Sequence, residues 1–313
     1  MTRVSVVVPT FERVERLPAL IAALEKQTLP VEDFDVIIAD DGSRDDTGAV
    51  LADLASQTQL NMRVVRNEVN RGPGAARNLG WRSSSSPVIA FTDDDCLPAP
   101  RWLEAGLACA DAAPATIVQG RTIPDPSVPN IGWTKTLEID RFSPLYQSCN
   151  IFYPTDLLRA VGGFDEEFSE PFGEDTAVGW TARRLGAASA FASEAVVLHS
   201  VSRPGIRYWW RYALMHHNFA TLARKFPEMR REFFWCRLFI WRNHAIFDAA
   251  LAGLLVGIAW RPALALLLPY AYIHRPRRFE RAEFFGVLQA SAFDAAILVG
   301  LLKGSVKERT LVL

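Results

Sequence analysis

The sequence predicts an α/β fold, in which a mixed, mainly parallel β-sheet is flanked by helices and followed by a helical, apolar and basic C-terminal region. Two observations lead to this prediction. In residues 1–120, short apolar runs rich in β-branched residues alternate with helix-like stretches, which is typical of strands joined by crossover helices. After residue 203 this alternation stops, and long apolar stretches flanked by Arg and Trp take its place.

The elements of the first part follow from these runs. The expected strands are Val4–Val8, Phe34–Ala39, Met62–Val65, Val88–Phe91 and Thr116–Val118, and the expected helices are Arg13–Lys26, Asp46–Ala55, Ala75–Arg82 and Pro100–Ala112. Helices on both faces of a parallel sheet bury its strands completely. Ligands of such sheets bind beyond the carboxyl ends of the strands, so this edge is where a site is expected.

The second part, residues 121–203, is less regular. Short strands are expected at Ser148–Tyr153 and Val196–His199, and a helix at Glu174–Leu185, with Gly186 as its stop. We therefore expect one globular domain over residues 1–203, made of halves 1–120 and 121–203. A helical region over residues 204–313 follows it.

Charge is distributed unevenly along the 313 residues. Residues 200–313 carry 17 Lys and Arg against 7 Asp and Glu, whereas residues 1–199 carry 17 against 28. A basic region can indicate an anionic partner such as nucleic acid or a lipid surface. Its aromatic residues lie within apolar runs and are not interleaved with basic ones, which argues against nucleic acid.

The C-terminal region has the composition of a membrane-associated segment. Its apolar runs are Ala245–Ala259, Ala263–Ile273 and Phe284–Leu302. The first two fall short of the roughly 20 residues that a span needs, and Asp248 and Asp294 count against simple spans. Trp beside Arg suits a membrane interface, so we expect peripheral or re-entrant attachment, with burial against a partner chain or the first domain as the alternative. The four cysteines form no CxxC pair and suit reduced thiols, so the expected location is the cytoplasmic face of the cell membrane.

Three consecutive aspartates, Asp93, Asp94 and Asp95, follow the fourth expected strand. Carboxylates at a buried strand end repel one another and lose solvation, so a compensating cation is expected. Mg²⁺ and Mn²⁺ bind carboxylate and phosphate oxygens. If the strand continued, Asp93 and Asp95 would face one ligand and Asp94 would face away. The alternative is a solvated acidic loop that caps the helix at Pro100.

Two further polar groups lie beside this strand end in the predicted sheet. Asp40 and Asp41 end the second strand, where they could bind a base or ribose or merely cap a helix. Glycines before Arg77 could place an anion at a helix N-terminus, or form an ordinary loop. Both groups therefore allow a nucleotide site without requiring one.

The second part adds acidic residues and a histidine. Glu174 and Asp175 open a helix, where acidic residues are also favoured by the macrodipole alone. His199 ends a short strand, and a lone histidine is more often structural than a metal ligand.

Taken in order, these motifs resemble those of the family 2 glycosyltransferases of the GT-A fold, a Rossmann-like fold. The resemblance covers about residues 3–200 and rests on Val4–Phe11, Asp40–Thr47, Gly74–Gly80, Phe91–Asp95, Asn150, Gly162–Asp165 and Gly173–Asp175.

The resemblance implies roles for individual residues. Donor binding falls to Pro9, Thr10, Glu12, Asp40, Asp41, Arg77, Asp93 and Asp94. Asp95 and His199 are the implied ligands of Mn²⁺ or Mg²⁺. Asp175 is the implied general base, with Glu174 beside it.

The function implied by the resemblance is inverting transfer of a sugar from a UDP-, GDP- or dTDP-linked donor to a lipid-linked or cell-envelope glycan acceptor. The Gln-x-x-Arg-Trp signature of processive members is missing after Asp175, which indicates addition of one or a few sugars. A sugar nucleotidyltransferase is the first alternative, but Pro9-Thr10-Phe11 lacks the Gly-rich basic loop it would need. The second alternative is a catalytically inactive membrane-associated scaffold, against which the joint presence of Asp95, Asp175 and His199 argues.

Overall fold

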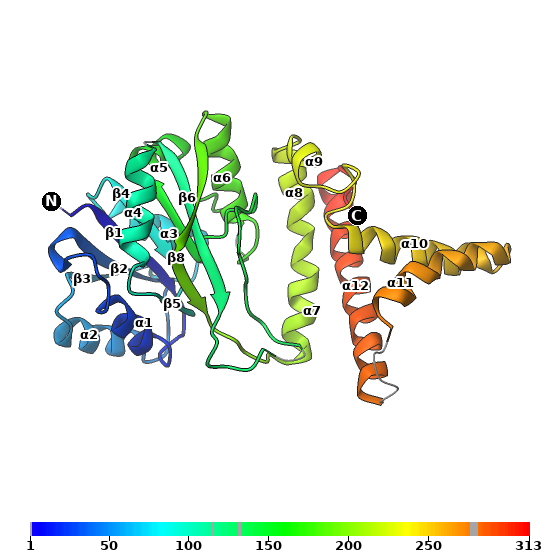
Figure 1. The fold of residues 1–313 in the computed structure, drawn as a ribbon, viewed down its shortest axis with the longest axis horizontal. Coiled ribbons are helices and arrows are strands. Elements are labelled where there is room, and N and C mark those ends of the chain that lie inside the picture. Colours follow the sequence, from blue (N-terminus) through cyan, green and yellow to red (C-terminus); the bar gives the residue numbers. More distant parts are fainter. Residues whose placement is uncertain (1, 114, 131–132, 169, 276–280) are drawn as a thin grey trace. The chain divides into compact units, whose positions relative to one another are not determined.

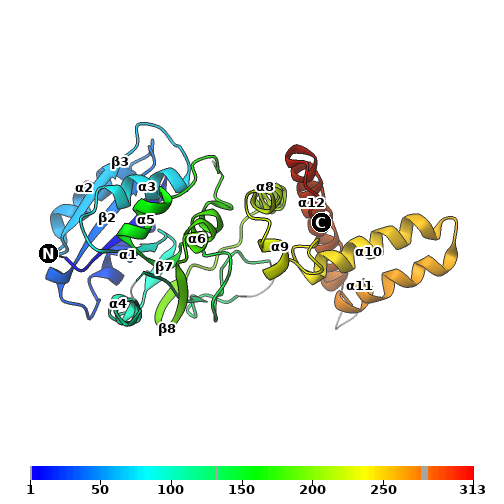
Figure 2. The ribbon, with the colours of Figure 1, turned by 90° about the horizontal axis from the view of Figure 1, so that it is seen from above.

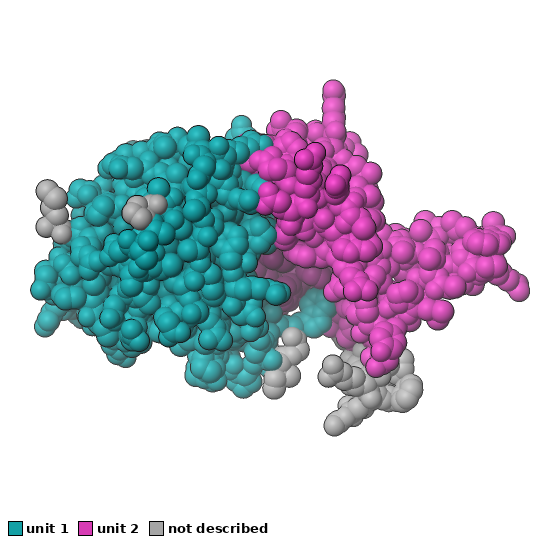
Figure 3. All heavy atoms as spheres, turned by 45° about the horizontal axis from the view of Figure 1, so that its top comes forward, with its two compact units in different colours: residues 1–203 teal, residues 204–313 magenta. Residues whose placement is uncertain are grey.

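The computed structural model describes residues 2–113, 115–130, 133–168, 170–275 and 281–313, with only the backbone described for 281–285. Contacts divide the chain into two compact units, residues 1–203 and 204–313 (Figure 3). The first unit contains the sheet and the second is helical (Figure 1).

The described part of the first unit contains a sheet of eight strands in the order β3-β2-β1-β4-β7-β6-β8-β5. The strands are β1 (Val4–Thr10), β2 (Phe34–Asp40), β3 (Met62–Arg66), β4 (Val88–Thr92), β5 (Cys96–Pro98), β6 (Thr116–Pro124), β7 (Asn150–Pro154) and β8 (Ala188–His199). The pairs from β3 to β4 are parallel, as is β6 with β8, whereas β7 and β5 pair antiparallel with their neighbours. The prediction of a mixed, mainly parallel sheet flanked by helices is confirmed.

Helices lie on both faces of this sheet (Figure 2). They are α1 (Leu17–Leu24), α2 (Thr47–Gln57), α3 (Pro73–Arg82), α4 (Trp102–Ala112), α5 (Thr155–Val161) and α6 (Glu174–Arg184). Val4, Val6 and Val8 of β1 belong to the core cluster under α1 and α4, whereas Val7 points the other way, toward Gly80 of α3. Every residue of β1 and β2 is buried, which explains why both strands are mainly apolar in the sequence. The polar residues in their interiors, Ser5 and Asp35, hydrogen-bond to each other.

The largest differences from the predicted elements lie at their ends. The helix expected to begin at Arg13 begins at Leu17, with Pro18 in its first turn, because the chain first turns away from β1. β6 and β8 are much longer than predicted, since they pair with each other through backbone hydrogen bonds that impose little apolar periodicity on the sequence. β5 was not predicted, because its three residues are too few to form a pattern.

The second unit contains α7 (Ile206–Leu214), α8 (Asn218–Lys225), α9 (Met229–Glu232), α10 (Arg242–Gly257), α11 (Leu267–Ile273) and α12 (Arg281–Glu308), with 3-10 turns η2 (Met215–His217) and η3 (Arg261–Leu266). The expected helical region over residues 204–313 is interrupted at residues 233–241, which form turns between α9 and α10. α12 packs on α7, η2 and α8, where Gly300 and Gly304 approach the backbone of Leu214 and His217. One face of this long apolar helix is therefore covered by protein.

α10 packs against η3 and α11 and forms a helical hairpin with them. The hairpin tip, which we define as residues 254–260 at the end of α10, is covered much less by protein than α12 is. On the inner side of the hairpin, Gly253 and Gly257 lie against η3, where an added Cβ at Gly257 would meet Leu264. The exposed apolar side chains of the tip are Leu254, Leu255, Val256, Ile258 and Trp260. The hairpin therefore ends in apolar side chains that are between 49% and 85% exposed.

A substitution at Gly106 tests how tightly α4 packs on the sheet. A Cβ at this position would overlap the ring of Phe152, which is fully buried and also packs against Trp102 at a centroid distance of 5.3 Å. We expect Gly106→Ala to lower the free energy of unfolding by about 1–3 kcal/mol, the usual cost of overpacking, although alanine favours helix formation. Thermal and urea unfolding of the full chain measure this.

Gly48→Ala in α2 is the matched control for this substitution. Its added Cβ would meet only the flexible end of Arg66, so the better helix propensity of alanine should leave stability unchanged or slightly higher. Equal effects of the two substitutions would show that contact with Phe152 does not limit this position.

Candidate active site at the carboxyl edge of the sheet

The candidate site begins where β1 and β4 end side by side. These parallel neighbours end at Thr10 and Thr92, and the chain then turns through Asp93–Cys96, closed by a 3.1 Å hydrogen bond from the Cys96 N–H to the Asp93 carbonyl. The hydroxyl of Thr10 donates a 2.8 Å hydrogen bond to Asp94. The first strand therefore holds the acidic turn that follows the fourth.

The three aspartates point to three different sets of partners. Asp93 lies 2.7 Å from Arg77, Asp94 bonds Thr10, and Asp95 faces His199. The expectation that Asp93 and Asp95 share one direction was wrong, because residues 93–95 form a turn and not an extended strand.

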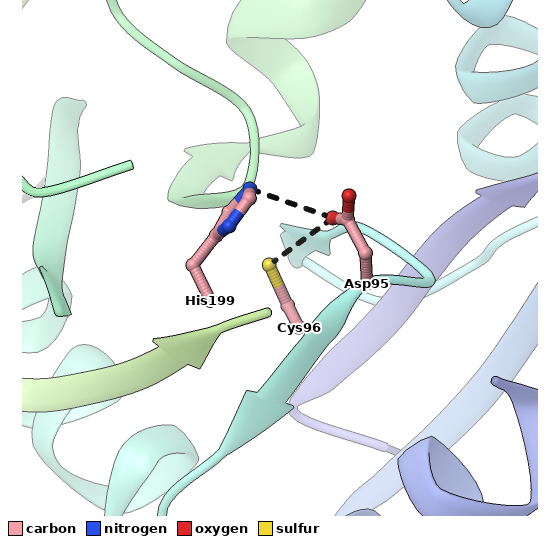
Figure 4. A group of neighbouring side chains, drawn as sticks. All are labelled: Asp95, Cys96 and His199. Atoms are coloured by element: carbon pink, nitrogen blue, oxygen red, sulfur yellow. Dashed lines mark hydrogen bonds and ion pairs between the residues drawn. The ribbon is translucent and has the colours of Figure 1, made fainter. Parts of the chain in front are cut away.

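Asp95 and His199 meet because of the register of β5 on β8. Cys96 pairs with His199 across these antiparallel strands, and the Ser200 N–H donates a 2.8 Å hydrogen bond to the Asp95 carbonyl. As a result, Asp95 Oδ1 lies 3.6 Å from His199 Nε2 and 3.8 Å from Cys96 Sγ (Figure 4).

Cations hold the other oxygen of Asp95. Lys135 Nζ and Arg16 Nη1 each lie 3.2 Å from Oδ2. Burial acts to raise the pKa of Asp95, but His199, Lys135 and Arg16 together lower it, so this carboxyl is ionised at neutral pH. Burial and the neighbouring Asp95 charge raise the pKa of Asp94 to about 7.

The residues fit a divalent cation. His199 Nδ1 lies 2.9 Å from the Ser200 carbonyl, to which it donates, so in the tautomer that could bind a metal ion the lone pair is on Nε2. That lone pair and the ionised Oδ1 of Asp95 then face each other at 3.6 Å, an arrangement that favours a cation between them. A carboxylate oxygen and an imidazole nitrogen are both ligands that Mn²⁺ accepts.

Arg77 connects this edge of the sheet to the start of α6. Its side chain is 5% exposed, and Nη1 lies 3.0 Å from Glu174 and 3.5 Å from Asp175 while Nη2 lies 2.7 Å from Asp93. Arg77, which was predicted to bind the donor, therefore points toward three carboxylates of its own chain. The prediction that it contacts the donor stays a prediction.

Asp175 and Glu174 differ in exposure and in partners. The Asp175 side chain is 21% exposed and accepts hydrogen bonds from the N–H of Ser148 at 3.0 Å and from its hydroxyl at 2.7 Å, whereas the Glu174 side chain is only 4% exposed. Burial raises the pKa of both, that of Glu174 to about 8, with the Asp175 charge as a further cause. Asp175 is therefore the member of the pair that is oriented and reachable.

Asp40 and Asp41 are buried and hydrogen-bonded within the chain. Asp40 accepts from the Ser43 N–H at 3.0 Å and pairs with Arg66 at 3.2 Å. Asp41 accepts from the N–H groups of Arg71 and Gly72 and so shapes the loop before α3. Their predicted contacts with base and ribose stay predictions.

Pro9 and Glu12 complete the predicted donor residues. Pro9 is buried within β1, and Glu12 just beyond it is exposed, with a left-handed backbone (φ 53°) and an N–H that donates to the Ser43 hydroxyl. Both lie next to the carboxyl end of β1, as expected.

Four residues of the site were not predicted: Arg16, Lys135, Ser148 and Cys96. Arg16 follows the first strand closely, which was the one signal available for it. Lys135 and Ser148 come from the irregular segment between β6 and β7, whose path only the tertiary structure shows.

Two solved structures resemble the chain in fold. Mannosyltransferase PcManGT from Pyrobaculum calidifontis, in complex with GDP-Man and Mn²⁺, has a TM-score of 0.70 and 20% identity, over 95% of this chain and 86% of that one. TarS 1–349 of Staphylococcus aureus in complex with UDP has a TM-score of 0.53 and 19% identity, over 96% of this chain and 92% of that one. At these identities the likeness shows a GT-A fold.

Sequence relatives agree with the fold. Validoxylamine A glucosyltransferase of Streptomyces hygroscopicus is 26% identical over 268 residues, 74% of this chain and 63% of the relative. Glycosyltransferase AglE of Haloferax volcanii is 28% identical over 209 residues, 63% of this chain and 66% of the relative. The chain thus spans less than two thirds of the length of these relatives. The family model for glycosyl transferase family 2 matches residues 5–164, half of the chain, which therefore belongs to that family.

Proposed function

We propose that this protein is an inverting, divalent-cation-dependent glycosyltransferase that moves a sugar from a nucleotide-sugar donor to a glycan or lipid-linked acceptor of the cell envelope. One observation carries the proposal. The Asp95–His199 pair and the hydrogen-bonded, partly exposed Asp175 lie in one constellation, in which Arg77 bonds both Asp93 and the carboxylates that open α6. A nucleotide-sugar transferase needs a group that binds the donor and a base that activates the acceptor next to each other.

Family membership and the relatives' names support the transferase activity. The two solved structures contain GDP-Man with Mn²⁺ and UDP, which supports a nucleotide-sugar donor here but leaves the choice among UDP, GDP and dTDP to experiment. TarS is named as a poly(ribitol-phosphate) β-N-acetylglucosaminyltransferase, which supports a cell-envelope acceptor.

The donor side uses residues at the ends of β1, β2 and β4. Asp95 and His199 would hold Mn²⁺ or Mg²⁺, which when bound neutralises charge on the departing nucleoside diphosphate. Lys135 and Arg16 orient the Asp95 carboxylate by binding its second oxygen. Asp40, Asp41 and Pro9, which are buried at the ends of β1 and β2, would contact the base and ribose.

The acceptor side depends on Asp175. One of its carboxylate oxygens takes the proton of the acceptor hydroxyl. At the same time the hydroxyl oxygen bonds the anomeric carbon, and the bond from that carbon to the diphosphate oxygen breaks. Attack from the side opposite the leaving group inverts the anomeric configuration. Ser148 holds the carboxylate in position, and burial raises the pKa of Asp175, which makes it a better proton acceptor.

Membrane attachment through the hairpin tip is part of the proposal. Leu254, Leu255, Val256 and Ile258 are all exposed, and successive positions on a helix point about 100° apart, so these side chains form one broad apolar face opposite the side on which Gly253 and Gly257 lie against η3. A broad exposed apolar face at the end of a hairpin, with Trp260 beside it, suits burial at the boundary between lipid headgroups and acyl chains. Gly286–Glu308 of α12 is the one helix of the described residues long and apolar enough to cross a membrane.

The proposed location follows from this attachment. The hairpin tip would place the protein on the cytoplasmic face of the cell membrane as a peripheral or re-entrant enzyme, with a lipid-linked acceptor in the same plane. Without the Gln-x-x-Arg-Trp signature, it would add one or a few sugars.

Nucleotide binding tests the donor site. We expect calorimetric titration with UDP, GDP and dTDP to show binding of one of them with Mn²⁺ and not with EDTA. Asp95→Ala should weaken that binding at least about 100-fold, because even outer-shell residues of metal sites contribute 10- to 100-fold. Asp156→Ala, which removes an exposed carboxylate on α5, should leave it unchanged. Folded protein that binds no nucleotide would favour an inactive scaffold.

Turnover tests the general base. We expect Asp175→Asn to lower kcat by about 100-fold or more, the scale of general-base loss, while nucleotide affinity stays close to that of the wild type. The amide keeps the shape of the side chain but cannot take the proton. A normal kcat in this variant, with Asp156→Asn as the control, would remove Asp175 from the role.

Vesicle binding tests the hairpin tip. We expect the double substitution Leu255→Glu and Ile258→Glu to reduce cosedimentation with anionic phospholipid vesicles by about 10-fold or more, because burial of one such side chain contributes about 1.5–3 kcal/mol. Leu185→Glu, at an exposed leucine of the first unit, is the matched control. A dimer that becomes monomeric in the double variant, with no vesicle binding by the wild type, would show that a second copy covers the tip.

A further inference from the structure

The turn that carries Asp95 also carries a thiol that the proposed mechanism does not use. Cys96 is fully buried, and its sulfur lies 3.8 Å from Asp95 Oδ1. Together with His199 Nε2, these ligand atoms lie within 4.8 Å of one another, and all three side chains converge on one point (Figure 4). The pairing of Cys96 with His199 across β5 and β8 fixes this arrangement in the backbone.

The spacing of these atoms suits a small tetrahedral ion. With zinc–ligand distances of about 2.3 Å to sulfur and about 2.1 Å to nitrogen and oxygen, tetrahedral angles put the ligand atoms about 3.4–3.6 Å apart. The measured separations from Asp95 Oδ1 are 3.8 Å to sulfur and 3.6 Å to nitrogen. The third separation, from sulfur to Nε2, lies within 4.8 Å, so the thiol and the imidazole would move toward each other to complete the site.

The unused atoms of both ligands already have partners. Lys135 and Arg16 bind the second oxygen of Asp95, and the Ser200 carbonyl accepts from Nδ1 of His199. Such outer partners orient ligands and fix the imidazole tautomer in metal sites. Oδ1, Nε2 and the sulfur, which also hydrogen-bonds with Cys149, are the ligand atoms that face one another.

We propose that Asp95, Cys96 and His199 form a three-residue site for a thiophilic transition-metal ion, Zn²⁺ or Co²⁺, with a fourth position open to water or to a phosphate oxygen of the donor. The proposal rests on the Asp95–His199 site of the proposed function and adds the residue that sets its metal preference. Thiolate favours Zn²⁺ and Co²⁺ over Mn²⁺ and Mg²⁺, which take harder ligands. Zn²⁺ would then compete with Mn²⁺ for the donor site.

Binding of the thiophilic ion exchanges one bond for another. The S–H bond of Cys96 breaks as the sulfur–metal bond forms, and the proton passes to the buffer, with no change of oxidation state. Mn²⁺ would bind Asp95 and His199 and leave the thiol protonated. Zn²⁺ and Mn²⁺ binding should therefore differ in proton release.

Cobalt spectroscopy of the full-length, metal-free protein tests the proposal. We expect Co²⁺ to produce a thiolate-to-cobalt charge-transfer band together with tetrahedral d–d bands. Cys96→Ser should lose the charge-transfer band and weaken Zn²⁺ binding at least about 10-fold, the lower end for loss of a supporting residue in a metal site. Mn²⁺ affinity, followed by electron paramagnetic resonance, should stay where it was.

Cys109→Ser is the matched control, because Cys109 is a partly buried free cysteine on α4 and lies outside the three-residue group. It should keep the band, whereas Asp95→Ala and His199→Ala should lose it. A charge-transfer band that persists in Cys96→Ser, or its absence in the wild type, would overturn the proposal.

A second measurement needs no variant. Calorimetry of the wild type in buffers of different ionisation enthalpy should show release of about one proton with Zn²⁺ beyond that with Mn²⁺. Equal release would overturn the proposal even if Cys96→Ser failed to fold. A cobalt band without Mn²⁺-dependent nucleotide binding would support the metal site and contradict the proposed donor function. Mn²⁺-dependent nucleotide binding without a cobalt band would support the donor function and contradict the thiolate site.

Discussion

The site depends on one buried guanidinium. Arg77 projects from α3 and bonds carboxylates of the turn after β4 and of the first residues of α6. Burying a charged group is costly unless its partners are well placed, and removing one partner leaves the others uncompensated. Arg77 therefore requires the acidic turn and the start of α6 to come together, which sets the distance between the donor and acceptor sides.

The second constraint is the register of a three-residue strand. β5 pairs antiparallel with the end of β8, and this pairing brings residues from distant parts of the sequence, Asp95 and His199, to face each other. The same register places Cys96 beside them. A shift by one residue would turn the side chains to the other face of the sheet and dismantle the site.

The helical unit has a different physical character. α12 is long and apolar, yet one of its faces packs on α7 and α8 through glycines. The tip of α10 has no such cover, and Ile258 is 85% exposed there. An exposed apolar face of this breadth is costly in water, which supports the proposed attachment of the hairpin tip to a membrane.

The sequence by itself determined the fold class, because β1 and β2 are buried on both faces and therefore appear as mainly apolar runs. It also singled out Asp95, Asp175 and His199, whose expected metal and proton-transfer roles come from the resemblance of the motifs to those of the family 2 glycosyltransferases. Tertiary structure decided how the three aspartates divide among their partners, because a turn and not a strand carries them. It also supplied Lys135 and Ser148, which come from an irregular segment whose path depends on contacts that local sequence does not encode.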